Sequence, residues 1–171
     1  MFEEIENLLS ENDLYFLENK CKNFHTSDTP HKSDDNTNSH NFYVRDMVNI
    51  KKNLIEFQVK IENYLFEKLK IKYKTNGIWI NKVTNKTNQS DDYHLDESDF
   101  TIITYLNDDF VGGEFVYLDS NNETISVKPK KNMCILQNNK LFHKINPVSS
   151  GVRYSCVTFL NYVAKDIKTL V

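Results

Sequence analysis

The chain has 171 residues, a formal net charge of −3, eleven phenylalanines and nine tyrosines. This length accommodates one domain with a substantial hydrophobic core and is too short for two comfortable ones. The mixed charge gives no electrostatic attraction to nucleic acid or to an anionic membrane, so we expect neither as a partner. No stretch approaches the roughly 20 apolar residues of a membrane helix, and the acidic start of the chain is unlike a signal peptide.

The cysteines are three in number and widely spaced, at Cys21, Cys134 and Cys156. They can form neither a disulfide framework nor a CxxC metal site. This usage is typical of a reducing compartment, and we predict a cytoplasmic or nuclear protein. Cys134 and Cys156 lie in apolar runs and are predicted to be small core residues.

Residues 1–76 are predicted to form a helical support region. Residues 1–24 carry apolar residues at helical spacing, with Ser10 as an N-cap and Asp13 three positions later. Residues 25–41 hold three histidines and no aliphatic residue, and we predict an exposed loop in preference to a metal site. A second helix is predicted from Asp46, as its cap, to about Lys70.

Beyond Gly77 the pattern changes to short β-branched and aromatic runs separated by turn residues. Such spacing is typical of a sandwich, jelly roll or barrel. We predict that residues 77–171 form a β-domain, in one structural unit with the helical region. The predicted strands are residues 78–83, 100–106, 113–119, 123–129, 132–137, 141–145 and 152–163.

A histidine and an aspartate, His94 and Asp96, stand two apart just before a strand-like run. In an extended chain such side chains share one face about 6.6 Å apart, so both could bind one ion. They would supply two ligands of a 2-His-1-carboxylate iron site. The pair alone is equally compatible with a surface histidine and a turn-capping aspartate. The only later histidine is His143, which alone would more often be a core residue.

Two further polar residues lie in predicted strands. Arg153 opens the most continuous apolar run, where a buried guanidinium needs an anionic partner and its planar fork suits a carboxylate. Tyr105 places a hydroxyl on a neighbouring strand. Each residue is also compatible with a purely structural role: Arg153 could pair with one of the acidic residues, and Tyr105 could be an ordinary aromatic residue of a strand.

The ordered set of these residues resembles the Fe(II)- and 2-oxoglutarate-dependent dioxygenases, specifically the prolyl 4-hydroxylase-like family. The resemblance is close over residues 78–162 and looser toward the start of the chain, where residues 5–21 look like the opening strand and helix of the family. The matching residues are His94, Asp96, Thr104 to Asn107, Gly112 to Glu114, Pro129, His143, Pro147, Val148, Gly151 and Arg153.

The resemblance implies a mainly β fold with N-terminal helices, built on a double-stranded β-helix, or jelly roll. It implies an enzyme with His94, Asp96 and His143 as iron ligands, and with Arg153 and Tyr105 binding the distal carboxylate of 2-oxoglutarate. The cofactors would be Fe(II), 2-oxoglutarate and O2, with ascorbate as a further candidate. Hydroxylation of a C–H bond would accompany conversion of 2-oxoglutarate to succinate and CO2. Because position 96 keeps a carboxylate, halogenation is disfavoured.

The substrate implied by Tyr105, which stands where the prolyl group has a tyrosine, is proline in a protein or peptide. Phe159 and Tyr93 are candidates for the substrate pocket, and residues 25–45 and 84–92 are candidates for a lid over a bound peptide. A lysyl hydroxylase-like reaction is one alternative. A nucleic-acid demethylase is disfavoured because a second arginine after the last strand is absent. A non-catalytic jelly-roll binding module is the alternative from a different class.

Overall fold

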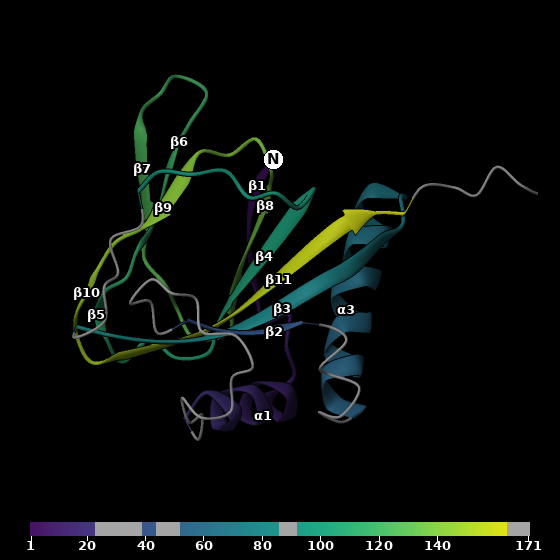
Figure 1. Ribbon diagram of the computed structural model, residues 1–171, viewed down its shortest axis with the longest axis horizontal. Helices are drawn as coiled ribbons and strands as arrows, with labels where there is room; N and C mark the ends of the chain where they lie inside the picture. The colour runs from purple at the N-terminus through teal and green to yellow at the C-terminus, as the bar shows by residue number, and fades with distance from the viewer. Residues whose placement is uncertain (23–38, 44–51, 86–91, 164–171) are drawn as a thin grey trace, which may run out of the picture.

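The computed structural model describes residues 1–22, 39–43, 52–85 and 92–163, arranged as one large β-sheet that faces two smaller ones, with two helices against the large sheet (Figure 1). Most of the predicted 25–41 loop, most of both candidate lids, and the predicted Asp46 cap lie outside these residues. No helix among the described residues is long and apolar enough to cross a membrane.

The larger sheet has six antiparallel strands in the order β1-β8-β4-β11-β3-β2. Strand β11 occupies an interior position and pairs along most of its length with both β3 and β4. The bounds are β1 Phe2–Glu6, β2 Ser39–Tyr43, β3 Tyr73–Thr84, β4 Phe100–Tyr105, β8 Met133–Asn138 and β11 Val152–Tyr162.

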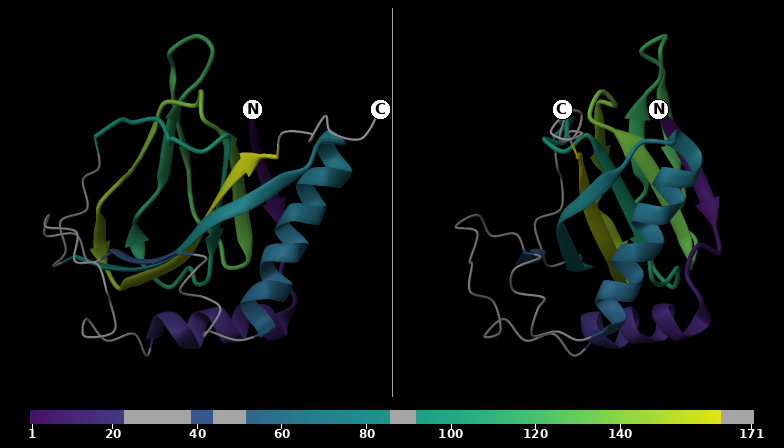
Figure 2. Two further views of the ribbon diagram at one scale, coloured as in Figure 1. Left: turned by 45° about the vertical axis from the view of Figure 1, so that its right-hand side comes forward. Right: turned by 90° about the vertical axis from the view of Figure 1, so that its right-hand side faces the viewer.

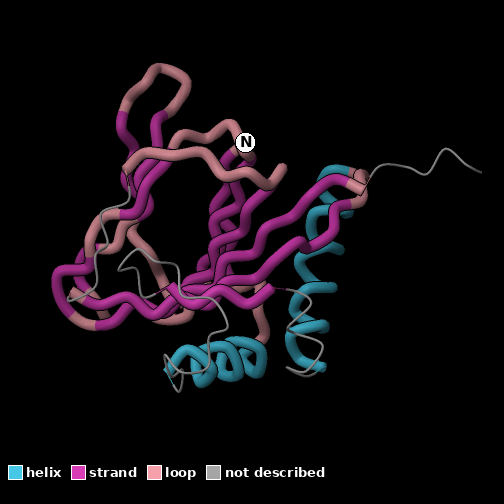
Figure 3. The backbone as a smooth tube through the Cα atoms, viewed as in Figure 1, coloured by secondary structure: helices cyan, strands magenta, loops and turns pink. Residues whose placement is uncertain are grey.

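The smaller side of the fold consists of a three-stranded sheet, β7-β6-β9, and a two-stranded sheet, β10-β5. Figure 3 shows these strands facing the large sheet across the interior of the molecule. The mainly β prediction and the jelly-roll architecture are confirmed. The bounds are β5 Val111–Gly112, β6 Phe115–Leu118, β7 Thr124–Val127, β9 His143–Ile145 and β10 Val148–Ser150.

Helices α1 (Glu11–Lys22) and α3 (Lys52–Leu69) cover the outer face of the large sheet (Figure 2). The predicted cap of α1 is confirmed: the Asp13 N–H donates to Ser10 Oγ at 3.3 Å, and the Ser10 N–H donates back to Asp13 Oδ2 at 3.3 Å. One core cluster joins the helices to the sheet and includes both Cys134 and Cys156, as predicted. A second cluster, including Tyr105 and Phe115, lies between the sheets.

Three local expectations are wrong. Residues 2–6 form β1 and not the helix that the apolar spacing over residues 1–24 suggests, because β8 offers them a partner edge from Phe2↔Gln137 to Glu6↔Met133. Residues 39–41 of the expected loop belong to β2, which pairs with β3. Residues 148–150, which lie between the predicted strands 141–145 and 152–163 and are not themselves expected to form a strand, form β10 opposite β5. In each case a strand from a distant part of the chain decides the structure, which local composition does not reveal.

Candidate active site

Three side chains with metal-binding atoms meet at one end of the interior: His94, Asp96 and His143. Their ligand atoms all lie within 4.8 Å of one another. The two histidines face each other because their backbones pair: the His94 N–H donates to His143 O at 2.8 Å and the His143 N–H donates to His94 O at 3.0 Å. This bridge attaches the segment before β4 to β9, so the strands bring together the three residues that the sequence singled out.

The histidine rings are oriented by their own backbone neighbours. His94 Nδ1 lies 2.9 Å from the carbonyl of Asp92, and His143 Nδ1 lies 2.9 Å from the carbonyl of Leu141. A carbonyl only accepts, so each Nδ1 donates a proton to it, and in the neutral imidazole Nε2 then has the lone pair that a metal would use. Both Nε2 atoms lie 4.0 Å from an oxygen of Asp96. Two neutral imidazoles and a carboxylate fit the donor set of a non-haem Fe(II) site.

The carboxylate of Asp96 is held on one side only. Its Oδ2 accepts from Thr101 Oγ1 at 2.5 Å and from Gln137 Nε2 at 2.7 Å. Thr101 and Gln137 are directly paired across β4 and β8, so one position of the sheet supplies both donors. The other oxygen, Oδ1, faces His94. The arrangement orients Asp96 for binding a metal through Oδ1.

Behind the three residues lies an inner cavity of about 130 Å³ between the two sheets. Alternate residues of β11, from Arg153 to Phe159, line it on one side. Arg153 is buried and donates through Nη1 to the carbonyl of Gly113 at 3.4 Å. A Cβ at Gly113 would stand 3.3 Å from Arg153 Cδ, so the glycine leaves room for the arginine.

Tyr105 lies in the same inner cavity and is completely buried. Its hydroxyl has no hydrogen-bond partner among the described residues. Burial raises the pKa of this phenol to about 12, partly offset by the nearby Arg153, so the group is a neutral donor. A buried unpaired hydroxyl is costly, and a carboxylate between Tyr105 and Arg153 would satisfy it. The residues therefore fit 2-oxoglutarate.

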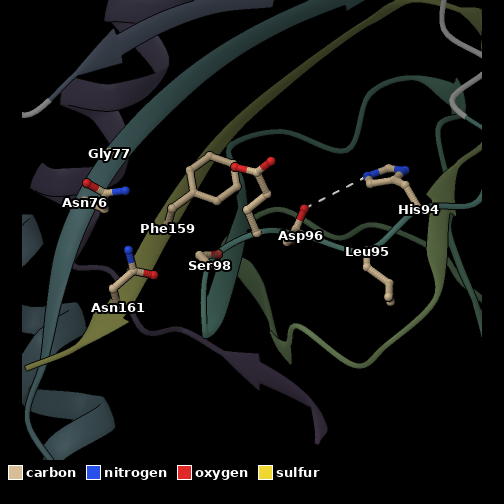
Figure 4. A pocket seen from close by; sticks show the side chains of 9 residues that line it. Asn76, Gly77, His94, Leu95, Asp96, Ser98, Phe159 and Asn161 are labelled. Atoms are coloured by element: carbon tan, nitrogen blue, oxygen red, sulfur yellow. Dashed lines mark ion pairs between the residues drawn. The ribbon is translucent and has the colours of Figure 1, made fainter.

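Beside His94 and Asp96 a wider outer cavity, of about 540 Å³, opens to the surface, and Figure 4 draws the side chains that line it. Phe159, His94 and Asp96 line both cavities. Figure 4 shows Phe159 between Asp96 and a pair of asparagines, Asn76 and Asn161. A molecule in the outer cavity would therefore meet His94 and Asp96, two of the three candidate metal ligands.

The second residue predicted for the substrate pocket, Tyr93, lines neither cavity. Its ring stacks on Phe142 with centroids 5.4 Å apart, and Lys144 Nζ lies 4.8 Å from the ring centroid. Sequence reasoning missed the donors Gln137 and Thr101. Both sit in ordinary strand patterns, and only the β4–β8 register brings them to Asp96.

Comparison with protein families matches residues 79–161 to the 2OG-Fe(II) oxygenase superfamily. The match spans the three candidate metal ligands, Arg153 and Tyr105. Among curated proteins, none matches this chain.

Solved structures share the fold at low sequence identity. A Trichoplax adhaerens prolyl hydroxylase in complex with a hypoxia inducible factor peptide fragment has a TM-score of 0.74 and 12% identity, over 94% of this chain and 83% of that one. A viral collagen prolyl hydroxylase of Paramecium Bursaria Chlorella virus-1 has a TM-score of 0.69 and 19% sequence identity, over 95% of this chain and 96% of that one. The epimerase SnoN of nogalamycin biosynthesis has a TM-score of 0.75 and 9% sequence identity, over 94% of this chain and 78% of that one.

Proposed function

We propose that this chain, whose residues 79–161 match the 2OG-Fe(II) oxygenase superfamily, is an enzyme that uses Fe(II), 2-oxoglutarate and O2 and that it hydroxylates a proline in a protein or peptide. The bound iron and cosubstrate supply the oxidising power, with succinate and CO2 as coproducts. The chain's own part is to bind, orient and shield the reactants.

The proposed roles follow the cavity from its deep end outward. Arg153 and Tyr105 bind the distal carboxylate of 2-oxoglutarate by charge-assisted hydrogen bonds. His94, Asp96 and His143 hold the iron, with the Nδ1 protons fixed on backbone carbonyls. Phe159, between the cavities, keeps water from the metal side while the substrate occupies the outer cavity.

The observation that carries the choice of proline is Tyr105, whose buried, unpaired hydroxyl stands beside Arg153 in the inner cavity. A tyrosine at this position is what the sequence shares with the prolyl hydroxylase group. The likeness in fold to two prolyl hydroxylases is compatible with this choice. The likeness to an epimerase shows that the fold alone does not determine the reaction.

The test is hydroxylation of a panel of proline-containing peptides by the protein supplied with Fe(II), 2-oxoglutarate and ascorbate under air. We expect the mass gain of one oxygen atom, placed on proline by fragmentation. His143→Ala should abolish the gain, whereas Asn63→Ala, on an exposed position of α3, should leave it unchanged. Oxygen placed on lysine would favour the lysyl alternative, and absence of any product from a protein that binds Fe(II) and 2-oxoglutarate would refute proline as the substrate.

A binding module is separated from an enzyme by an anaerobic titration of the apo-protein with Fe(II) and 2-oxoglutarate. We expect the visible metal-to-ligand charge-transfer band in the parent protein and none in His143→Ala. Arg153→Ala should need far more 2-oxoglutarate to produce it. A folded parent protein without the band would support the non-catalytic module.

A further inference from the structure

A bulge in β3 turns an asparagine toward the outer cavity. In the β3–β11 pairing Phe159 is opposite Gly77 and Leu160 is opposite Thr75, which leaves Asn76 without a partner. Regular alternation would place Asn76 on the face of Ile78, which packs beneath the helices. Because of the extra residue, Asn76 and Gly77 both line the cavity.

Helix α3 supports this bulge. The Thr75 N–H, freed from the regular ladder, donates to Glu62 Oε1 at 2.8 Å. Gln58 Nε2 donates to the same Glu62 oxygen at 2.9 Å and holds the carboxylate in place. The helix thus fixes the irregular strand segment whose side chain faces the substrate cavity.

A second carboxamide, that of Asn161, lies beside Asn76 on the neighbouring strand (Figure 4). Asn161 Oδ1 accepts from the Asp99 N–H at 3.3 Å, which leaves its Nδ2 hydrogens for a ligand. The carboxamide of Asn76 makes no hydrogen bond to any other described residue, so both its donor and its acceptor are available. A peptide backbone, which offers alternating carbonyls and N–H groups, matches this pair.

The charge of the outer cavity comes from acidic residues. Among the described residues, Glu97 is the only ionisable one that lines the cavity besides His94 and Asp96, and no described lysine or arginine lines it. Glu97 is exposed and forms no ion pair with any residue in the described part of the chain. With His94 and Asp96 occupied by the metal, Glu97 is the one lining carboxylate left to attract a charged group of the substrate.

From these observations we infer that the outer cavity binds a cationic peptide. Asn76 and Asn161 hydrogen-bond its backbone, and Glu97 pairs with a lysine or arginine next to the hydroxylated residue. The inference rests on the proposed function and specifies its substrate class. Glu97 directly follows Asp96, a candidate iron ligand, and both line the outer cavity. The lysine or arginine that Glu97 binds would therefore lie close to the residue that is hydroxylated.

The test compares three proline peptides that differ at one flanking position, which carries Lys, Gln or Glu, with each flanking position tried in turn. Binding is measured by calorimetry and hydroxylation by mass spectrometry, for the parent protein, Glu97→Gln and Glu97→Lys. Glu123→Gln, which removes an exposed carboxylate outside both cavities, is the matched control. Asn76→Ala tests the backbone contact separately.

We expect the parent protein to bind the Lys peptide about two- to fivefold more tightly than the Gln peptide at one flanking position, as for a partly exposed ion pair. Glu97→Gln should remove the preference, Glu97→Lys should transfer it to the Glu peptide, and Glu123→Gln should keep it. A higher salt concentration should weaken the preference of the parent protein for the Lys peptide. Asn76→Ala should weaken all three peptides equally.

The inference and the proposed function fail in different ways. Equal binding of the three peptides by the parent protein and by Glu97→Lys would overturn the inference, whether or not proline is hydroxylated. Charge-dependent binding that follows residue 97, without oxygen on proline, would support the cationic-peptide site and refute proline as the target.

Discussion

Gln137 donates a hydrogen bond to Oδ2 of Asp96 at 2.7 Å, and the same Nε2 atom lies 3.1 Å from Nε2 of His143. One carboxamide on β8 therefore touches two of the three candidate iron ligands, which come from different segments. Its carbonyl oxygen Oε1 is buried without a partner among the described residues. We infer that the Gln137 side chain serves to position Asp96 and His143, because only its Nε2, and not its Oε1, makes such contacts.

The first prediction concerns Gln137→Leu. We expect the Fe(II) affinity to fall about 10- to 100-fold, because Asp96 loses a donor that orients it. The midpoint of thermal unfolding of the apo-protein should not fall, since leucine has a similar size and removes the unpaired Oε1. Anaerobic Fe(II) titration and calorimetry check both parts, with Asn63→Leu on α3 as control. Unchanged iron affinity would show that Thr101 alone positions Asp96.

The second prediction concerns Tyr105→Phe. The affinity for 2-oxoglutarate should fall about tenfold or more, as expected for loss of a hydrogen bond to a charged group. Without metal or cosubstrate, the variant should be as stable as the parent protein or more so, because the hydroxyl has no hydrogen-bond partner among the described residues. Titration of 2-oxoglutarate by the charge-transfer band, with thermal unfolding of the apo-protein, measures the two effects. A loss of apo-stability without loss of affinity would contradict the proposed role.

The third prediction concerns the glycine turn between the sheets. Gly112 has φ +82°, and a Cβ there would stand 2.2 Å from the backbone oxygen of Pro147. Gly112→Ala should therefore lower the free energy of unfolding by more than the roughly 1–2 kcal/mol that a left-handed conformation costs. Asn122→Ala is the matched control, because Asn122 has φ 61° on an exposed turn. Equal losses in urea denaturation would mean that β5 and β10 shift apart without cost.

The fourth prediction concerns alkaline pH. Burial raises the pKa of the Cys134 thiol from 9.0 to about 11, although the nearby Thr104 hydroxyl lowers it slightly. The folded protein then holds a proton that the unfolded chain has lost, so stability is complete below pH 9 and falls as the pH rises toward 11. The slope should be about 1.4 kcal/mol per pH unit.

Denaturation at a series of pH values in this range, for the parent protein and Cys134→Val, isolates the thiol. The variant should lose the contribution of one proton to the slope. Tyr105 should add a further decline from pH 10 toward 12, for the same reason. Identical slopes in the two proteins would show that another group causes the loss.

The strands that carry the site are predictable from the sequence because their composition and their surroundings agree. Residues 100–106 and 152–163 are rich in β-branched and aromatic residues, and they form β4 and β11 within one or two residues of the expected ends. His94, Asp96 and His143 were identifiable because their chemical types and chain order are distinctive, and the structure brings their ligand atoms together.

The remaining features depend on pairing between distant segments. Gln137 acts on Asp96 only because β8 stands beside β4 with Thr101 opposite Gln137. Asn76 reaches the outer cavity only because of a bulge whose position is set by β11 and by Glu62 of α3. A one-residue change of register would move either side chain to the other face of the sheet, and local composition does not specify register.

The interior position of β11 has a consequence for biosynthesis. In the large sheet β3 and β4 are separated by β11, so neither has that neighbour until residues 152–162 have left the ribosome. A nascent chain up to that point exposes the apolar faces of β4 and β8. Sheets assembled from such distant segments fold in milliseconds to seconds, slowly for a domain of this size. The interval before β11 inserts is therefore when a chaperone would have most to bind, and a shortened chain ending before β11 should aggregate.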